Sequence, residues 1–197
     1  AVSLNGNVLA IGAIDGNTVK VFDKVDGAWI ARPDITYNAS STQLKSIDMS
    51  DDGTVIVISS NGTKGIDVYD WVDGAWIRRP DLPSVENAAT VNCSSDGSTI
   101  AYNGTDYNIF VYVWDGSTWV KDAEIDYASA TNNPSSNGKV FMSRNANSIV
   151  IILYGGPVFF SKRLDGAWDT IGEFGDRYDY SYVGFPPDGS FVAAIVD

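Results

Sequence analysis

The sequence predicts an all-β fold built from tandem copies of one short unit. Gly, Asn, Ser, Thr and Asp are abundant among the 197 residues, whereas Leu, Glu and Lys are scarce. That bias favours short strands and tight turns over helices. Two signatures then recur along the chain: a turn followed by an apolar strand, and a hairpin that ends in tryptophan.

The first signature is a two-residue turn followed by a short apolar strand such as Val55-Ile56-Val57-Ile58. Its glycines lie 47, 44, 41 and 51 residues apart, a spacing typical of one structural unit repeated along a chain. The five turns are Asn5-Gly6, Asp52-Gly53, Asp96-Gly97, Asn137-Gly138 and Asp188-Gly189.

The second signature is a hairpin. A strand such as Val19-Lys20-Val21-Phe22 runs into an Asp-Gly turn, which suits the positive φ angles of a tight hairpin. A tryptophan follows ten residues after the first apolar residue of the strand in every copy, even where the turn at Asp115-Gly116 is one residue longer. The four tryptophans are Trp29, Trp76, Trp119 and Trp168.

One further segment before the next turn, as in Leu44–Met49, gives each repeat four strands in about 45 residues, the size of a propeller blade. A lone four-stranded sheet buries one face adequately, so neighbouring blades must stack. The sequence therefore predicts a β-propeller of four-stranded antiparallel blades, about four and a half in a single array over 1–197. The expected blades span 1–35, 44–82, 88–124 and 129–173, with a partial blade at 179–197.

The repeats resemble those of FG-GAP and integrin-α-type propellers, which are WD40-like. The resemblance is carried by Ser95-Asp96-Gly97 through Val111–Trp119, and by Ser50–Gly53 through Trp76. It covers nearly the whole chain and implies the propeller fold. It implies little about function, because propellers host binding, scaffolding and catalysis alike.

The same family often carries a calcium loop of the form Asp-x-Asp-x-Asp-Gly, with oxygen ligands at alternate positions. The nearest stretch here, Asp48–Gly53, has a different spacing, and the other repeats retain less of the pattern. We therefore expect no cofactor and no dedicated metal site. Weak Ca²⁺ binding by surface carboxylates stays open.

The net charge of −12 argues against binding to nucleic acid, which needs clustered Lys and Arg. It argues equally against an anionic membrane surface, and no apolar run approaches the length of a spanning helix. We interpret the acidity as aspartate in turns that keeps the surface soluble. Binding of divalent cations by some of those loops is the alternative.

Catalytic chemistry finds little support in the sequence. The chain has no histidine, which excludes Ser-His-Asp and Cys-His catalysis and the usual zinc sites. The single cysteine, Cys93, lies in an alternating apolar stretch and is expected to be buried and inert. Paired carboxylates serve glycosidases, but here aspartate recurs at turn positions, so we expect no catalytic residues and no enzyme.

Aromatic side chains offer a different function. Trp71 and Trp114, beside Tyr69 and Tyr112, would suit a glycan-stacking platform, and a lectin or adhesin is therefore the alternative function. Their recurrence at one blade position favours packing between blades instead.

The fourth repeat departs most from the others, and loops of propellers carry function. We expect a contact loop there, formed by Tyr154, Phe174, Asp176, Tyr178 and Tyr180. Sequons also allow glycosylation if the protein is secreted by a eukaryote. The candidates are Asn38, Asn61 and Asn103, whereas Asn92 lies inside an apolar strand.

The chain starts partway through a first strand and ends after the second strand of a fifth repeat. Because an unpaired half-blade exposes strand edges, we expect a protein partner or self-association through the terminal strands. The alternatives are a longer chain, or terminal strands that pack back on the first blade and close a small ring. The sequence thus predicts a non-catalytic interaction or structural module, a building block of an extracellular, cell-surface or virion assembly.

Overall fold

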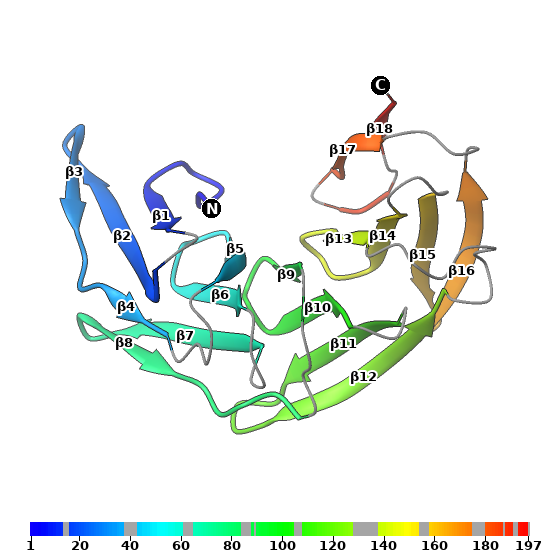
Figure 1. Ribbon diagram of the computed structural model, residues 1–197, viewed down its shortest axis with the longest axis horizontal. Helices are drawn as coiled ribbons and strands as arrows, with labels where there is room; N and C mark the ends of the chain where they lie inside the picture. Colours follow the sequence, from blue (N-terminus) through cyan, green and yellow to red (C-terminus); the bar gives the residue numbers. More distant parts are fainter. Residues whose placement is uncertain are drawn as a thin grey trace.

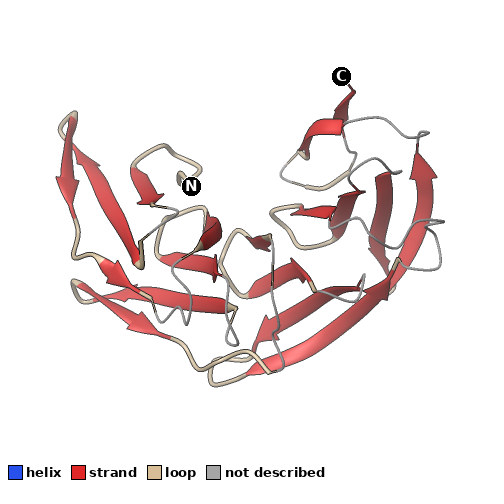
Figure 2. Cartoon of the chain, viewed as in Figure 1, coloured by secondary structure: helices blue, strands red, loops and turns tan. Residues whose placement is uncertain are grey.

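The computed structural model contains strands and no helix in its described part (Figure 2). It describes residues 1–13, 16–37, 43–60, 65–83, 88, 90–104, 108–127, 138–153, 158–174, 180–186, 188–190 and 193–196. Among these residues, nothing forms a helix long and apolar enough to cross a membrane.

Four antiparallel four-stranded sheets follow one another in the described residues, and we call them blades 1 to 4. Blade 1 has β1 (Val8–Gly12), β2 (Thr18–Val25), β3 (Ala28–Ala31) and β4 (Ile35–Thr36). Blade 2 has β5 (Leu44–Met49), β6 (Val55–Ser60), β7 (Ile66–Val72) and β8 (Ala75–Arg78). Blade 3 has β9 (Val91–Cys93), β10 (Thr99–Asn103), β11 (Asn108–Trp114) and β12 (Trp119–Asp126). Blade 4 has β13 (Gly138–Met142), β14 (Ser148–Leu153), β15 (Val158–Leu164) and β16 (Ala167–Phe174), and β17 (Tyr180–Gly184) pairs with β18 (Ala193–Val196).

The blades are arranged along an arc (Figure 1). Strands β5, β9 and β13 line the inside of the arc, while β8, β12 and β16 lie at its outer rim, and the two chain ends lie at opposite ends of the arc. In blade 1, β1 corresponds to β6, and Val2 pairs with Leu9 where the other blades have their innermost strand. This is the predicted all-β propeller architecture.

The hairpins match the predicted register. Asp26 and Gly27 have φ angles of 50° and 83°, and Asp73, Asp165 and their glycines repeat this geometry. Each hairpin tryptophan pairs with the strand residue five positions before it, as Trp76 pairs with Trp71. The constant strand-to-tryptophan interval is therefore a constant cross-strand register.

One turn assignment from the sequence is wrong. Gly138 begins β13, the innermost strand of blade 4, and is not the turn glycine of that repeat. The turn lies instead at Asn145-Ala146, where Ala146 adopts a φ of 54°, and the strand that follows is Ser148–Leu153. The sequence pattern missed this turn because alanine occupies the position that glycine takes in the other repeats.

The recurring serine before each of these turns has a structural role. Ser50 Oγ donates to Asp52 Oδ1 at 2.6 Å and accepts the Val55 N–H at 2.9 Å. Asp52 Oδ1 also accepts the Thr54 N–H at 2.9 Å. Ser3 with Asn5, Ser94 with Asp96 and Ser143 with Asn145 repeat the Ser–Asx hydrogen bond. The aspartates of the turn motif thus close the turn, because a short polar side chain there caps backbone N–H groups.

The hydrophobic core lies between blades rather than inside one sheet. One cluster joins blades 1 and 2, a second joins blades 2 and 3, and a third joins blades 3 and 4. In the first of these, Val19 and Val21 of β2 pack with Ile56 and Ile58 of β6, and all four side chains are at most 1% exposed. Each blade therefore depends on its neighbours for burial of its faces.

Candidate functional site: the faces between blades

A buried arginine joins blade 1 to blade 2. Arg32 lies three residues after the hairpin tryptophan, and we call this the clasp position. Its Nε and Nη2 donate to the Asp23 carboxylate at 2.8 and 2.7 Å, and Nη1 donates to the Gly53 carbonyl of blade 2 at 2.9 Å. The guanidinium lies 4.6 and 5.4 Å from the ring centroids of Trp71 and Trp76.

Blade 2 repeats the arrangement toward blade 3. Arg79 donates to Asp70 at 2.8 and 2.7 Å and to the Gly97 carbonyl at 2.8 Å. Its guanidinium lies 5.1 and 5.5 Å from the rings of Trp114 and Trp119. Both arginine side chains are under 10% exposed, and the fork-shaped guanidinium suits such a site because it bonds a carboxylate in pairs while stacking on aromatic rings.

The clasp between blades 3 and 4 has the opposite polarity. Asp122 occupies the clasp position and accepts hydrogen bonds from Arg163 Nη2 and, at 3.0 Å, from Trp168 Nε1. Arg163 stands in the register that Trp71 and Trp114 occupy in blades 2 and 3. The carboxylate now comes from the preceding blade and the cation from the following one.

Backbone hydrogen bonds link the blades at the inner rim. The Leu4 N–H donates to the Asp51 carbonyl at 2.9 Å. The Asp51 N–H donates to the Ser95 carbonyl, and the Ser95 N–H donates to the Arg144 carbonyl, both at 2.7 Å. These residues occupy the second position of the four Ser-x-Asx turns. One peptide group per turn therefore connects consecutive blades.

Arg144 adds side-chain bonds at the same rim. Its Nε donates to Asp51 at 2.7 Å and its Nη2 to the Met49 carbonyl at 2.7 Å, both in blade 2, and Nη1 donates to the Cys93 carbonyl at 3.3 Å. Asp48, whose Oδ2 accepts the Cys93 N–H at 2.8 Å, lies 3.7 Å from Nη1. Burial raises the pKa of Asp48, against the opposing effect of these hydrogen bonds and of Arg144.

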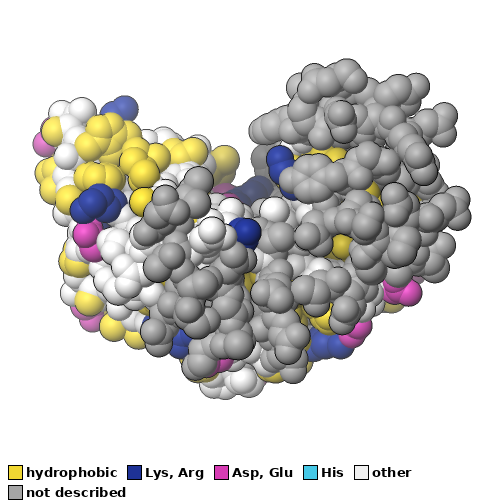
Figure 3. Space-filling model, viewed as in Figure 1, with side chains coloured by type: hydrophobic (Ala, Val, Ile, Leu, Met, Phe, Trp, Pro, Cys, Tyr) yellow, Lys and Arg dark blue, Asp and Glu magenta, His cyan; other side chains and the backbone are white. Residues whose placement is uncertain are grey.

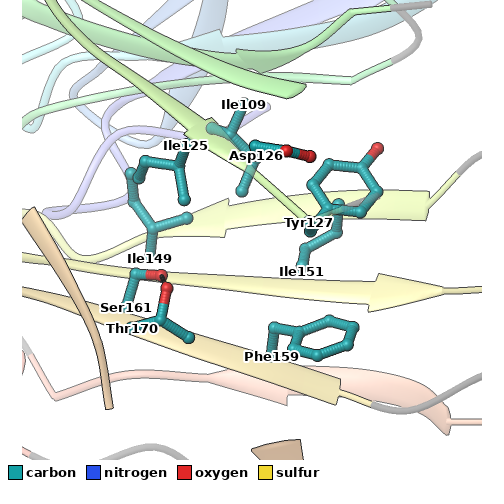
Figure 4. Close-up of a pocket in the computed structure, with 9 residues that line it drawn as sticks. All are labelled: Ile109, Ile125, Asp126, Tyr127, Ile149, Ile151, Phe159, Ser161 and Thr170. Carbon is teal, nitrogen blue, oxygen red and sulfur yellow. Dashed lines mark hydrogen bonds between the residues drawn. The ribbon is translucent and has the colours of Figure 1, made fainter. Parts of the chain in front are cut away.

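A cavity of about 30 Å³ lies between blades 3 and 4 (Figure 4). Ser161 on its wall occupies the register of Tyr69 and Tyr112, whose hydroxyls donate to the carbonyls of Thr36 and Pro83 in the preceding blades at 3.3 and 3.0 Å. A cavity of this size has room for water, whereas one that binds benzene measures about 150 Å³. We attribute it to the loss of a tyrosine ring rather than to a ligand site.

Blade 1 has an exposed apolar face. Ile11 on β1 is 52% exposed, whereas its counterparts Ile58, Tyr102 and Ile151 are at most 1% exposed because the preceding blade covers them. Trp29 is 46% exposed. Figure 3 shows hydrophobic side chains gathered over this blade, at the upper left. Exposed apolar patches are common where proteins bind other proteins.

The contact loop predicted in the fourth repeat lies mostly outside the residues that the structure describes. Tyr154, Asp176 and Tyr178 fall outside the described residues. Phe174 ends β16 and Tyr180 begins β17, and only their backbones are described. The contact loop expected from the sequence therefore stays a prediction.

The structure contradicts one glycosylation candidate. Asn103 is 1% exposed, its Nδ2 donates to the Gly138 carbonyl at 2.8 Å and its Oδ1 accepts the Thr90 N–H at 2.8 Å. An amide held in this way is inaccessible to a transferase. Asn38 and Asn61 lie outside the described residues.

The tryptophans considered for glycan stacking pack against arginines of the neighbouring blades. Trp71 and Trp114 are half-buried and lie beneath Arg32 and Arg79, as packing between blades predicts. In the described part of the chain, no three His, Cys, Asp or Glu side chains are grouped to hold a metal ion. The clasp residues are not among the predicted site residues, although each lies three residues after a hairpin tryptophan in the sequence.

Comparison with solved structures identifies the fold. No family model matches the chain, and no curated protein matches its sequence. The β-propeller domain of Cps50 (Swd1) from Myceliophteria thermophila superposes with a TM-score of 0.73 at 12% identity, over 100% of this chain and 60% of that one.

Two further structures are similar. Hydrazine synthase from Kuenenia stuttgartiensis gives a TM-score of 0.71 at 18% identity, over 99% of this chain and 54% of that one. A functionally unknown protein from Desulfotomaculum acetoxidans gives 0.74 at 10% identity, over 99% and 61%. The chain thus spans less than two thirds of each of these three chains, and the likeness shows that its fold is that of a β-propeller.

Proposed function

We propose that this chain is a non-catalytic β-propeller module that binds another protein through the exposed face of blade 1. The observation that carries the proposal is the contrast between Ile11, at 52% exposure, and its counterparts in the other three blades, at 1% or less. Burying one such side chain contributes about 1.5–3 kcal/mol, so this face gains stability from any well-fitting partner.

The face has the composition of an interface. Ile11 and Trp29 are exposed, and Leu9 and Phe22 beside them are partly exposed. Aromatic residues are enriched at the centres of protein interfaces, where they supply much of the binding energy. The acidic surface of the chain adds solubility but offers no basic groove for nucleic acid.

Several finer points stay predictions. These are the FG-GAP subtype, self-association through the terminal strands, and the setting in an extracellular, cell-surface or virion assembly. Glycan binding stays the alternative function; a glycosidase is less favoured. The propeller likeness supports a scaffold for protein interaction and does not distinguish among these points.

Site-specific photo-crosslinking in the producing cells tests the proposal. A photoreactive phenylalanine at position 11 should give one defined protein adduct. The matched control is the same group at Val120, which is 50% exposed and lies on the outer strand of blade 3. The same adducts at both positions, or none at position 11, would contradict the proposed function.

A further inference from the structure

The polarity of each clasp follows one cross-strand pair. In each hairpin the residue five positions before the tryptophan pairs with it across the turn. The pairs are Lys24 with Trp29, Trp71 with Trp76, Trp114 with Trp119, and Arg163 with Trp168. The first member is thus a cation in blades 1 and 4 and a tryptophan in blades 2 and 3.

The clasp residue of the preceding blade matches this pair. Arg32 and Arg79 face the two Trp–Trp pairs, with guanidinium groups 4.6–5.5 Å from the rings. Asp122 faces the pair that contains Arg163. The physical reason is direct, because a cation is attracted by aromatic faces, whereas opposite another cation a carboxylate is favoured and a guanidinium repelled.

Blade 1 has the blade 4 form of this pair. Lys24 Nζ lies 5.9 Å from the Trp29 ring, as the Arg163 guanidinium lies 5.2 Å from the Trp168 ring. A group that docks on blade 1 in the manner of the other blades would meet a cation beside a tryptophan. The complementary group at that point is a carboxylate.

A glycine supplies a second, independent match. A Cβ built on Gly53 would lie 2.5 Å from Val8 of blade 1, and one on Gly97 would lie 2.5 Å from Val55 of blade 2. Val8 and Val55, each the first residue of its strand, thus pack against the turn glycine of the following blade. Around Gly6 of blade 1, nothing described lies within 4 Å of the same position.

We propose, resting on the proposed function, that the exposed face of blade 1 binds a propeller blade that carries Asp or Glu at its clasp position. That blade also places a β-branched residue against Gly6, where Val8 and Val55 stand in the existing interfaces. Among the described blades, blade 3 alone has an acidic clasp residue, Asp122, and it already binds Arg163. The occupant is therefore a further blade of this repeat type.

The test keeps the full chain and adds one blade before it. A copy of residues 88–140 is fused ahead of Ala1, which places Ser3 in the register of Ser143 and presents the copied Asp122 to Lys24. The matched control carries Asp122→Arg in the copied segment only. A third variant combines this control with Lys24→Glu in blade 1. Amide exchange in blades 2 to 4 verifies that each protein is folded.

Exchange of the β1 and β2 amides is the readout. The aspartate fusion should slow it about tenfold relative to the unextended chain, the arginine fusion should lose most of that protection, and Lys24→Glu should restore it. Equal protection by the aspartate and arginine fusions would overturn the acidic preference while leaving the docking face standing. No protection by any fusion would overturn the docking face itself, and with it the proposed function.

Discussion

Asp122 of blade 3 accepts hydrogen bonds from both Arg163 and Trp168 of blade 4, where the two preceding interfaces place an arginine on the earlier blade. The reversal extends to the neighbouring position, since Val113 replaces the aspartate that bonds Arg32 and Arg79 in blades 1 and 2. Each interface is thus complementary in itself, and the polarity changes as a unit.

Removal of a clasp should destabilise the whole array. Arg32→Ala leaves the partly buried Asp23 and the Gly53 carbonyl without their donor, and loss of one partner from a buried ion pair costs about 3–5 kcal/mol. Because Asp23 is 35% exposed, we expect the lower end, about 3 kcal/mol, in urea unfolding. Arg32→Lys should recover only part of this, since an ammonium lacks the paired fork. A loss below about 0.5 kcal/mol would show that the clasp is structurally idle.

Exchanging the two charged residues of the clasp between blades 3 and 4 should cost less stability than changing either one alone. Asp122→Arg places two guanidinium groups together and should destabilise by about 1–2 kcal/mol, because both side chains retain roughly a quarter of their exposure. The double variant Asp122→Arg with Arg163→Asp should be more stable than the sum of the single changes allows. Denaturant unfolding of all four proteins gives the coupling energy, and additive effects would contradict a direct pairing.

Cys93 should resist modification in the folded protein. Burial, together with the nearby Asp48 carboxylate, raises the pKa of its thiol well above the ordinary value, so thiolate is scarce. Reaction with a disulfide reagent should be at least about a hundredfold slower than in denaturant, and should track opening of the blade 2–blade 3 interface. Rapid labelling under native conditions would place the thiol outside the core.

Acid should weaken the turns. Burial opposes ionisation of Asp52 and Asp96, but hydrogen bonds donated by Ser50 and Thr54 to the former, and by Ser94 and Ser98 to the latter, outweigh it and lower both pKa values below 3.8. A lowered folded-state pKa stabilises the protein above the unfolded value, and this stability is lost as the pH falls through the folded one.

Asp52→Asn with Asp96→Asn tests this contribution. Asparagine stands at the same position in Asn5 and Asn145, so the variant is expected to fold. Its unfolding free energy should fall less steeply than that of the unmodified chain as the pH is lowered below about 4. Identical pH profiles would contradict the lowered pKa values.

The missing ring at Ser161 predicts a matched pair of effects. Tyr112→Ser should open the corresponding cavity between blades 2 and 3 and cost about 3–5 kcal/mol, because Tyr112 is 4% exposed and its hydroxyl bonds Pro83. Ser161→Ala should change stability by less than about 1 kcal/mol, since its hydroxyl has one long contact, 3.5 Å, with Thr170. Equal costs would refute the assignment of the cavity.

The hairpins and their register were predictable because turn chemistry is local. Asp26-Gly27 needs positive φ angles, and the ten-residue interval fixes which residues pair across the turn. The fourth turn was not predictable from a glycine pattern, since Ala146 bears the positive φ there.

The contacts between blades were harder to predict because they join residues far apart in sequence. Arg144 donates to Asp51, which lies 93 residues away, and neither residue type nor local sequence pattern predicts this hydrogen bond. Asn103 was a glycosylation candidate by its sequon, but its strand lies inside a blade and both ends of its amide are bonded to neighbouring segments. The periodicity of the sequence predicted the blade, whereas the contacts between blades became visible only in the structure.

The most direct test of the stacked-blade architecture is amide exchange at Leu4, Asp51 and Ser95, measured by NMR on the intact chain. These residues lie in turns, yet each donates its N–H to the carbonyl of the next blade at 2.7–2.9 Å. We expect all three amides to exchange at least about a hundredfold more slowly than those of the exposed hairpin-tip glycines Gly27 and Gly74. Exchange as fast as at those tips would contradict the stacking of the blades along this rim.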